Sequence, residues 1–413
     1  MAAHTLCCKV NQCDTEAILA RLGSIGGTQR DFAQGADICI INTCTVTHGS
    51  DKKSRQMIRR ARAINPQGLV AVCGCMAKND PTTPQSLGVD FIFDARNPED
   101  FIAQVAGLFP HTGQGVAPKG QRTRAFVKIQ DGCDRFCAYC IVPHVRGKPI
   151  SRPTHDILTE VQGHIAHGVQ EIVLTGIQVA SYGEDTNDTT LGNLIQAIAQ
   201  VNGLMRLRLS SIEPNAFTPE FIRQVSSCDI LCPHFHISLQ SGCDATLKRM
   251  NRHYTTRAYA HILESIGGPH MAFTTDIIVG FPGETDQEFE ETLAFVKRMG
   301  FARIHVFEYS PRAGTPAATF PNQVPDKIKT ARSQKMRDLG KALQTEFFAA
   351  QVGKTLPVLF ESKNKDGQWQ GYTSHYSPVT VASDRDLANT LVDIHIIGHH
   401  HDALAGQFPN IQS

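Results

Sequence analysis

The sequence predicts an α/β protein with three domains: an N-terminal doubly wound α/β domain, a central partial (β/α)6 barrel and a small C-terminal all-β barrel. Three observations support this prediction. Short apolar runs alternate with amphipathic stretches in two series, a segment rich in Gly and Pro at residues 110–124 separates the series, and residues 352–413 contain strand patterns without helices. A chain of 413 residues is also too long for one compact core.

Residues 1–109 form the predicted N-terminal domain. Its apolar runs have the character of buried parallel strands, and helical stretches at Asp14–Leu22 and Asp51–Ile64 separate them. The strand-like runs are Thr5–Val10, Ala36–Ile41 and Leu69–Cys73. Open α/β sheets bind ligands beyond the carboxyl ends of their strands, so we expect functional residues just after these runs.

Residues 119–349 form the predicted central domain. Six strand patterns alternate with helical stretches here, two βα units fewer than in a complete barrel of eight, which predicts an open partial barrel. The strand-like runs are Ala125–Gln130, Glu171–Thr175, Arg206–Ser210, Phe235–Leu239, Thr275–Val279 and Arg303–Phe307. Helical stretches include Thr154–His167, Leu191–Val201 and Asp286–Met299.

Residues 352–413 form the predicted C-terminal domain, which follows an amphipathic helix at Lys327–Gln351. Strand-like runs at Thr355–Phe360, Pro378–Ala382 and Thr390–Ile397 are separated by polar turns. This pattern predicts a small all-β barrel.

The composition excludes several classes of protein. Forty basic residues against 39 acidic ones argue against a generally basic nucleic-acid coat, so any RNA contact must be local. No stretch approaches the roughly 20 apolar residues of a membrane span. Thirteen cysteines without an export signal indicate a reducing, cytoplasmic environment in which thiolates serve as ligands.

Three cysteines lie close together in a Cys-x-x-x-Cys-x-x-Cys run formed by Cys133, Cys137 and Cys140. A cubane iron–sulfur cluster has four irons, so three thiolates leave one iron open for a substrate. The alternative is zinc, because His144 would complete a Cys3His set. The run follows the first strand of the predicted barrel, on the face where barrel enzymes keep their active sites.

A second set of cysteines follows the predicted strands of the N-terminal domain. Cys8, Cys44 and Cys75 each fall at or just past the end of a strand, so parallel pairing would bring them to one edge of the sheet. Cys39 and Cys73 lie inside strands and are interpreted as core residues. The alternative is that all of these thiols serve only packing, because free Cys is commonly buried.

The sequence around the central cysteines resembles the signature of radical S-adenosylmethionine (SAM) enzymes, in the version found in the methylthiotransferases. The matching segment runs from Asp131 to Pro143, and the N-terminal cysteine motifs are similar to the UPF0004 domain of that family. The C-terminal residues resemble a TRAM domain. Further segments resemble sequences of this family, and they are Ser238–Gly242, Leu247–Arg252, Gly280–Thr285 and Tyr309–Ala317.

Within the family, the resemblance is greatest to the threonylcarbamoyladenosine tRNA methylthiotransferases, through Cys8–Asn11 and Leu174–Val179. Sister groups modify isopentenyladenosine in tRNA or an aspartate of a ribosomal protein. Three positions depart from the usual pattern: Cys7 replaces Gly, Lys78 replaces Gln, and Gln178 replaces a frequent Asn. Cys7 competes with Cys8 as a ligand, and the register of the motif favours Cys8.

The resemblance implies two 4Fe-4S clusters, one held by Cys133, Cys137 and Cys140 and the other by Cys8, Cys44 and Cys75. It also implies that the first cluster binds SAM and generates a radical from it. Phe136 and Tyr139 would screen this cluster from water. Thr175, Gly176 and Glu213 would contact SAM, with Glu213 accepting hydrogen bonds from the ribose.

The implied reaction inserts a methylthio group at carbon 2 of threonylcarbamoyladenosine beside the anticodon of tRNA. RNA is read mainly at single-stranded loops, which suits an anticodon-loop substrate. A sulfur donor and a flavodoxin-like reductant are the implied partners. A hypothesis of another class is a non-catalytic, zinc-containing RNA-binding protein.

The C-terminal barrel would grip the RNA in the manner of small β-barrel RNA binders, but its charge gives weak support for phosphate binding. From Val352 onward, four Lys or Arg residues stand against six Asp or Glu residues, a net charge of −2. The stronger basic candidates are residues 52–62, with six cationic side chains, and residues 248–257.

Overall fold

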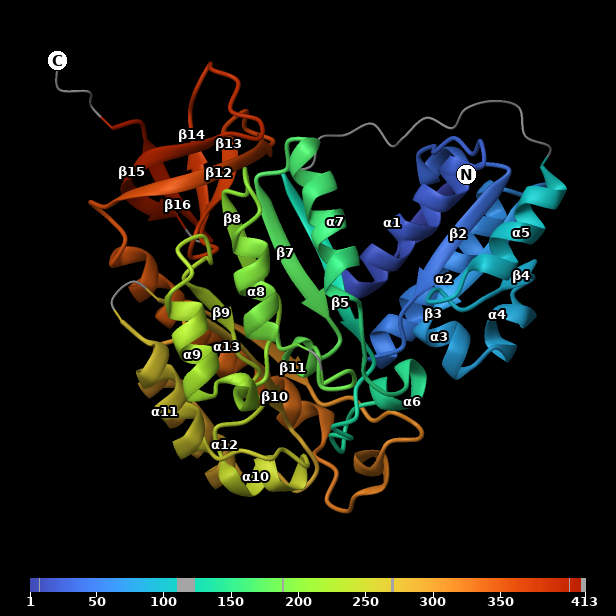
Figure 1. Cartoon of the computed structure of the whole chain (residues 1–413). Helices are drawn as coiled ribbons and strands as arrows, with labels where there is room; N and C mark the ends of the chain where they lie inside the picture. Colours follow the sequence, from blue (N-terminus) through green and yellow to red (C-terminus); the bar gives the residue numbers. More distant parts are fainter. Residues whose placement is uncertain (7, 110–122, 188, 269–270, 401, 410–413) are drawn as a thin grey trace. The chain divides into compact units, whose positions relative to one another are not determined.

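The computed structural model describes residues 1–6, 8–109, 123–187, 189–268, 271–400 and 402–409 (Figure 1). The described chain divides into two compact units. The first unit comprises the described parts of residues 1–120, 131–148 and 310–318, and the second comprises those of 121–130, 149–309 and 319–413. All six cysteines proposed as cluster ligands belong to the first unit, because the segment with Cys133, Cys137 and Cys140 packs with the N-terminal residues.

The first unit is built on a parallel sheet with the strand order β1-β2-β3-β4. The strands are β1 (Ala2–Thr5), β2 (Ile38–Thr43), β3 (Leu69–Gly74) and β4 (Phe91–Ile92). Every residue of β2 is buried, as expected for a parallel strand that is covered on both faces.

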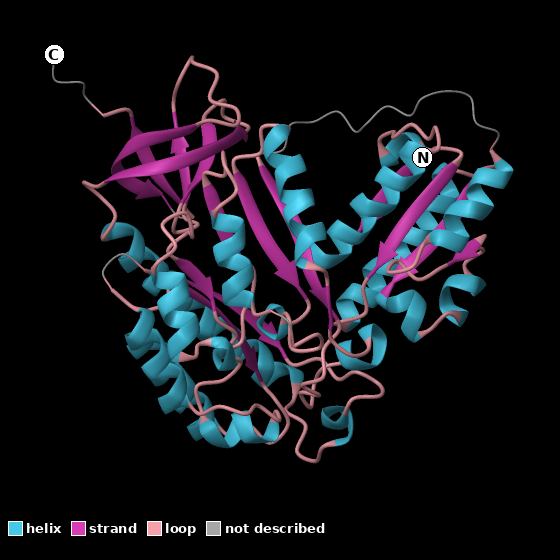
Figure 2. Cartoon of the chain, in the orientation of Figure 1, coloured by secondary structure: helices cyan, strands magenta, loops and turns pink. Residues whose placement is uncertain are grey.

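Helices cover both faces of this sheet (Figure 2). On one face, α1 (Lys9–Ser24) and α5 (Glu99–Leu108) bury Ile18, Leu22 and Phe101 against alternate residues of β2 and β3. On the other face, α2 (His48–Ile64) and α3 (Cys75–Asn79) bury Ile58, Ala61 and Met76 against the remaining alternate residues. The predicted doubly wound arrangement is therefore confirmed. The unit also contains η1 (Phe32–Gln34), α4 (Thr82–Ser86) and α6 (Val142–Arg146).

The prediction of a first strand over Thr5–Val10 is wrong beyond Thr5, because α1 begins at Lys9. Cys8 caps this helix: its Sγ accepts a hydrogen bond from the backbone N–H of Asn11 at 3.4 Å. A short polar cap within an apolar run converts what would be a strand into the start of a helix.

The second unit contains the predicted open barrel. Its strands form two sheets, β6-β5-β7-β8 and β11-β10-β9. The pairs β5–β7, β7–β8, β9–β10 and β10–β11 are parallel, and isolated bridges connect residues in and next to β8 with residues next to β9. The bounds of the strands are β5 (Arg124–Asp131), β6 (Ile150–Ser151), β7 (Glu171–Gly176), β8 (Arg206–Leu209), β9 (His234–His236), β10 (Ala272–Val279) and β11 (Arg303–Glu308). The six predicted barrel strands are all present. The segment 110–122 of the predicted linker lies outside the described residues, and Arg124 already belongs to β5.

Helices line the outer side of this partial barrel. Helices α7 and α8, for example, bury Ile157, Leu194 and Ile198 against β5, β7 and β8 in the main apolar cluster of the unit. The helices are α7 (Thr154–Ala166), α8 (Leu191–Ala199), α9 (Pro219–Ser226), α10 (Asp244–Arg249), α11 (Thr256–Ile266), α12 (Asp286–Met299) and α13 (Asp326–Ala349), with short 3-10 turns η2 (Val179–Ser181), η3 (Pro214–Ala216) and η4 (Pro316–Thr319). Among the described residues, no helix is long and apolar enough to cross a membrane.

The C-terminal part of the second unit is a closed barrel with the strand order β12-β13-β14-β16-β15. Its strands are β12 (Thr355–Lys363), β13 (Trp369–Thr373), β14 (Pro378–Val381), β15 (Leu391–His400) and β16 (Ala403–Gln407). The sequence prediction located β12, β14 and β15 and missed the two strands that contain Gly371 and Gly406. A Cβ at Gly406 would lie 2.3 Å from Ile394 Cγ2, so glycine is required there for close strand packing.

A buried carboxylate ties the sheet of the second unit to this closed barrel. Glu171, at the start of β7, accepts a hydrogen bond from Arg208 Nε at 2.8 Å, and Arg124 and Arg206 lie within 4.0 Å. Arg208 also donates to the carbonyl of Ser374, and Arg206 donates to that of Tyr372. Burial raises the pKa of Glu171, but the charges of the three arginines outweigh it and hold the pKa below its usual value.

Replacing Glu171 by Gln should lower the stability of the protein at pH 7 by about 3–5 kcal/mol, because the buried arginines lose their counter-charge. Since the pKa of Glu171 is lower in the folded state, its contribution is present at neutral pH and is lost as the pH falls through the folded pKa. The difference in thermal unfolding between wild type and Glu171→Gln should therefore shrink in acid. A constant difference between pH 7 and the acid range would contradict this account.

Candidate metal centres

Three of the predicted ligand cysteines follow neighbouring parallel strands. Cys8 lies three residues after β1, Cys44 directly follows β2, and Cys75 directly follows β3. Because β1, β2 and β3 are adjacent and parallel, these cysteines follow the same edge of the sheet. Cys44 and Cys75 are buried, with 2% and 7% of their surfaces exposed, whereas Cys8 is exposed. Cys7 lies outside the described residues.

Side-chain amides hold the three cysteine segments together. Asn11 Nδ2 donates to the carbonyl of Leu6 at 3.0 Å and to that of Thr43 at 3.1 Å. Asn42 Nδ2 donates back to the carbonyl of Asn11 at 2.9 Å. Thr43 Oγ1 donates to the carbonyl of Cys73 and accepts from the backbone N–H of Ala77, which joins the second segment to the third. Buried hydrogen bonds of this kind fix the relative positions of the three loops.

Gly74 sets the direction in which Cys75 leaves the sheet. Its φ of +87° lies in the region that favours glycine. A Cβ at this position would lie 2.3 Å from Asn42 Oδ1 and 2.4 Å from the carbonyl oxygen of Thr43. The chain can therefore turn from β3 into α3 only with glycine at this residue.

The Cys133–Cys140 segment forms a compact loop that ends in α6. Cys133 donates its backbone N–H to the carbonyl of Gly147 at 2.9 Å, and Cys140 donates to that of Cys137 at 2.9 Å. Gly132 has a φ of +77°, and a Cβ there would lie 2.0 Å from the carbonyl oxygen of Lys148. The two ends of the loop are thus held against each other by backbone contacts.

The two aromatic residues of this loop differ in exposure. Phe136 has a positive φ of 45°, and 55% of its surface is exposed. Its ring meets that of His144 edge to face at 5.9 Å. Tyr139 is half-buried. Their predicted role as a screen stays a prediction.

Arg146, the last residue of α6, connects the two groups of cysteine segments. Its guanidinium donates to Asp131 at 2.8 Å, to Asp14 at 3.1 Å and to the side-chain oxygen of Asn11. Asp131 immediately precedes the central cysteine loop, whereas Asn11 and Asp14 lie in α1 just after Cys8. One buried side chain therefore contacts both cysteine-bearing parts of the first unit.

The charge of Arg146 also acts on Cys75. Burial raises the pKa of the Cys75 thiol, while the charge and hydrogen bond of Arg146 act in the opposite direction. Burial alone would lower the pKa of Arg146, but Asp131, the Cys75 thiolate and Asp14 raise it above its usual value. The pKa of the Cys75 thiol remains raised overall, but by less than burial alone would raise it, because the Arg146 charge opposes the effect of burial.

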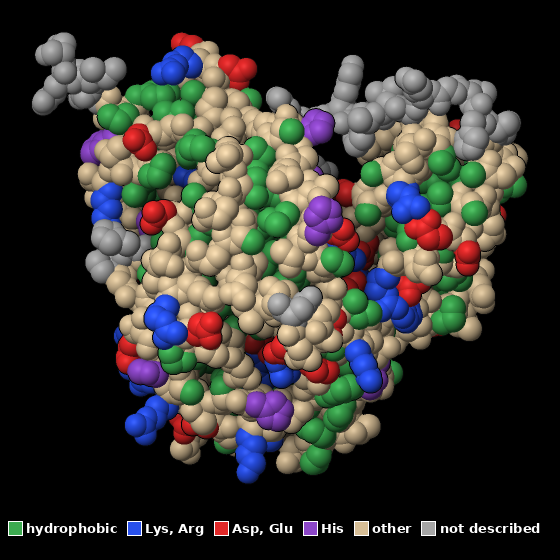
Figure 3. All heavy atoms as spheres, viewed as in Figure 1, with side chains coloured by type: hydrophobic (Ala, Val, Ile, Leu, Met, Phe, Trp, Pro, Cys, Tyr) green, Lys and Arg blue, Asp and Glu red, His purple; other side chains and the backbone are tan. Residues whose placement is uncertain are grey.

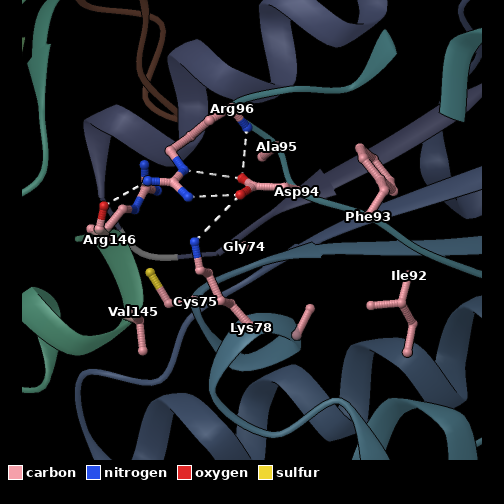
Figure 4. A pocket seen from close by; sticks show the side chains of 11 residues that line it. Gly74, Cys75, Lys78, Ile92, Phe93, Asp94, Ala95, Arg96, Val145 and Arg146 are labelled. Carbon is pink, nitrogen blue, oxygen red and sulfur yellow. Dashed lines mark hydrogen bonds and ion pairs between the residues drawn. The ribbon is translucent and has the colours of Figure 1, made fainter. Parts of the chain in front are cut away.

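A cavity of about 300 Å³ lies beside Cys75. Figure 4 shows Arg96 and Lys78 directed toward Asp94 in its wall. Arg96 binds both oxygens of Asp94, at 3.1 and 2.7 Å, and also donates to the carbonyl of Arg146 at 2.6 Å. The Arg96 hydrogen bonds are the main reason that the pKa of Asp94 lies well below its usual value. Lys78, which departs from the usual family residue, thus belongs to the surroundings of a candidate ligand.

Residues 310–318 complete the surroundings of Cys44. Arg312 donates to Asp51 and to Thr45 Oγ1, each at 2.6 Å, and Thr45 donates to Asp51 at 2.7 Å. Ser54 Oγ accepts from the backbone N–H of Cys44 and donates to its carbonyl. Both backbone polar groups of Cys44 are therefore satisfied, and the thiol is held by a rigid loop.

The predicted SAM-contacting residues lie in the second unit. Thr175 is buried near the end of β7, and a Cβ on the adjacent Gly176 would lie 3.0 Å from the carbonyl oxygen of Gln130. Glu213 accepts a hydrogen bond from Arg252 at 2.9 Å. Arg252 also donates to the hydroxyl of Tyr254. The Arg252 guanidinium thus orients the Glu213 carboxyl group.

Sequence reasoning missed Arg146, Arg252 and Arg312 as residues of these sites. Arg252 and Arg312 lie within family-like segments that were recognised without roles, and Arg146 closely follows the central cysteines. Most side-chain partners of these arginines lie 39 or more residues away in the sequence. The exceptions are Asp131, a partner of Arg146, and Tyr254, a partner of Arg252. A long-range partner of this kind leaves no periodic signal in a single sequence.

The cysteines suit thiolate-ligated clusters better than a single ion. All six are free thiols. In the part of the chain that the structure describes, no three His, Cys, Asp or Glu side chains converge closely enough to hold one metal ion. Zinc would need sulfurs about 2.3 Å from one centre, whereas a 4Fe-4S cluster offers each thiolate a separate iron. Thiolates are the usual protein ligands of iron–sulfur clusters, so the donor set fits iron–sulfur ligation.

Comparisons with known proteins agree with both groups of motifs. Residues 127–296 match the radical SAM superfamily, and residues 1–94 match the uncharacterized protein family UPF0004. The threonylcarbamoyladenosine tRNA methylthiotransferase MtaB of Bacillus subtilis (strain 168) is 37% identical over 435 residues, covering 100% of this chain and 96% of the relative. The chain belongs to the radical SAM methylthiotransferase family.

Other relatives define the breadth of this family. The tRNA-2-methylthio-N(6)-dimethylallyladenosine synthase of Syntrophotalea carbinolica is 32% identical, covering 98% of each chain. The radical SAM methyltransferase TsrM from Kitasatospora setae has a similar fold, with a TM-score of 0.58 at 13% identity over 77% of this chain and 76% of that one. As a methylthiotransferase, the protein is an enzyme that transfers sulfur-containing groups and uses SAM and two 4Fe-4S clusters.

Replacing Gly74 by Ala in this methylthiotransferase should displace Cys75 and lower bound iron, because the added Cβ would overlap Asn42 and Thr43. Iron and sulfide analysis after anaerobic reconstitution measures the effect. Gly23→Ala in α1 is the matched control, since a Cβ there meets nothing within 4 Å. Equal iron content in the two variants would show that the turn at Gly74 does not position a ligand.

Replacing Arg146 by Gln should destabilise the first unit by about 3–5 kcal/mol, because Asp14 and Asp131 would remain buried without a counter-charge. Arg146→Lys keeps the charge and should lose less. The exposed pair of Arg21 and Glu99 provides a control, since Arg21→Gln should cost under about 1 kcal/mol. Thermal unfolding measures the loss of stability in each of the three variants. Similar losses of stability for Arg146→Gln and Arg21→Gln would contradict this role for Arg146.

Proposed function

We propose that this protein inserts a methylthio group at carbon 2 of threonylcarbamoyladenosine next to the anticodon of tRNA. The observation that carries the proposal is the similarity over the full chain to MtaB proteins. The first two relatives, from Bacillus subtilis and Chlamydia pneumoniae, are named for this activity and are 37% and 34% identical. Relatives named for dimethylallyladenosine are 32–34% identical, so that substrate is the principal alternative.

Cys133, Cys137 and Cys140 would hold the SAM-binding cluster, and Cys8, Cys44 and Cys75 would hold the second cluster. Each trio would leave one iron without a protein ligand. When bound, the clusters and SAM supply the radical and sulfur-transfer chemistry that protein side chains lack. The protein itself would position the thiolates through Asn11, Thr43 and Arg146. It buries Cys44, Cys75 and Cys137.

The second unit would bind the rest of SAM. Glu213 is held by Arg252, and its carboxyl oxygens would accept hydrogen bonds from the ribose hydroxyls. Thr175 and Gly176 end the neighbouring strand β7, where a backbone without a bulky side chain can approach a ligand closely. Phe136 and Tyr139 would shield the first cluster once its ligands close around it.

The reaction implies several partners. The anticodon loop of tRNA would present the base as an unpaired nucleotide. A sulfur donor and a flavodoxin-like reductant would supply the atom and the electrons that the products require. These partners would meet the protein in the cytoplasm, in agreement with its free thiols.

Iron analysis tests the cluster assignment. Wild-type protein reconstituted without oxygen should contain about eight irons per chain, and Cys137→Ala and Cys44→Ala should each contain about half of that, because each empties one four-iron site. Cys228→Ala, a buried cysteine of the second unit, is the control and should keep the wild-type content. A variant that loses no iron would remove its cysteine from the assignment.

Nucleoside mass spectrometry tests the substrate. Transfer RNA from a strain without this gene should lack 2-methylthio-threonylcarbamoyladenosine and retain the methylthio form of dimethylallyladenosine. Complementation with wild type should restore the first nucleoside, whereas Cys137→Ala and Cys44→Ala should not. Loss of the methylthio form of dimethylallyladenosine instead would assign the protein to the alternative branch. Unchanged tRNA would favour an aspartate of a ribosomal protein as the substrate.

A further inference from the structure

Helix α2 presents an outer face that consists largely of cations. Ser54, Ile58 and Ala61 are buried on its inner face. From Lys52 onward, the exposed side chains fall on the opposite side of the helix at the spacing of a single stripe, and they are Lys52, Lys53, Gln56, Arg59, Arg60 and Ala63. We call Lys52, Lys53, Arg59 and Arg60 the cationic face of α2. With a rise of 1.5 Å per residue, this face extends about 12 Å along the helix axis.

The charges of this face are not compensated within the described protein. None of its four cations forms an ion pair with another described residue. Arg62 on the same helix behaves differently, because it pairs with Asp90 and donates to the carbonyl of Gly88. The single acid of α2, Asp51, is bound by Arg312. A solvated helix usually carries charges of both signs, so four unpaired cations form a local excess.

This local excess of cations differs from the nearly neutral composition of the chain as a whole. The chain has 40 basic and 39 acidic residues in total. Figure 3 shows Lys and Arg side chains scattered among Asp and Glu over the face that it draws. A concentrated cationic face in a nearly neutral protein therefore marks a specific place for an anionic partner.

The cationic face is rigidly connected to the loop that carries Cys44. Helix α2 begins at His48, four residues after Cys44, and Thr47 caps it by accepting a hydrogen bond from the backbone N–H of Ser50 at 3.1 Å. Asp51 is joined to Thr45 by a hydrogen bond of 2.7 Å. A partner bound to this face would thus be held at a fixed position relative to a candidate cluster ligand.

We propose that the cationic face of α2 binds the sugar–phosphate backbone of the RNA that carries the base to be modified. The proposal rests on the proposed function, which supplies an RNA substrate. The face contains no aromatic or large aliphatic side chain, whereas protein interfaces have an apolar centre. Lysines and arginines without such a centre suit repeated phosphates, which position an RNA without reading its sequence.

A binding measurement on the full-length reconstituted protein tests this surface. The probe is a fluorescein-labelled anticodon stem–loop RNA, and its anisotropy gives Kd at several salt concentrations. In a variant with Lys52, Lys53, Arg59 and Arg60 all replaced by Gln, the affinity at about 100 mM salt should fall at least about tenfold. The slope of log Kd against log salt should fall by about 0.7–0.9 for every phosphate contact removed.

A second quadruple variant separates this effect from a general loss of charge. Lys297, Arg298, Lys327 and Lys341 are exposed on α12 and α13, and replacing them by Gln removes the same four charges. This control should bind the RNA like the wild type. Equal weakening in both variants, or unchanged binding in the α2 variant, would overturn the proposal.

Iron content and tRNA products distinguish this proposal from the proposed function. The α2 variant should keep the wild-type iron content and unfolding temperature, because its changed side chains are exposed. If it binds RNA normally and still restores the methylthio nucleoside, the surface assignment fails while the function stands. If wild-type protein produces no methylthio nucleoside, the proposed function itself fails, whatever the RNA affinity of the two variants.

Discussion

The first unit depends on one buried cation. The guanidinium of Arg146 lies among Asp14, Asp131, Asn11 and Cys75, which come from three separate segments of the chain. A charge removed from water must be balanced nearby, and here the balancing groups also carry or adjoin the candidate ligands. Thiolates gathered at one place repel each other, so a fixed positive charge beside them lowers the free energy of the arrangement.

The sequence predicted those parts of the molecule whose cause is local. Strand ends and cysteine positions follow from short apolar runs, so Cys44 and Cys75 were correctly placed at the edge of the sheet, and Cys39 and Cys73 in the core. The start of α1 was misjudged because a single capping thiol, Cys8, overrode an apolar run. The strands around Gly371 and Gly406 were missed because glycine gives no strand signal. The partners of Arg146 and Arg312 could not be predicted, because they depend on how distant segments pack.

The second unit also buries a cluster of charges, which lies at the amino-terminal ends of strands β5, β7 and β8. Glu171 lies among three arginines, and two of them, Arg206 and Arg208, also donate to backbone carbonyls of the C-terminal barrel. The stacked rings of Tyr372 and Tyr376 lie against Arg124, which pairs with Glu361. Charged and aromatic groups here replace an apolar interface. The barrel is consequently held in a defined orientation on the sheet, since hydrogen bonds to arginine are directional and hydrophobic contacts are not.

The three cysteines at the edge of the first sheet are protected unequally. Cys44 and Cys75 are almost fully covered, whereas Cys8 faces solvent at the cap of α1. Dissolved oxygen or peroxide would therefore reach Cys8 before Cys44 or Cys75, so oxidation of the proposed ligand set would begin at this sulfur. Oxidation would first remove one of the three thiolate ligands. The exposed position of Cys8 would also give iron access to the site when the cluster is reassembled.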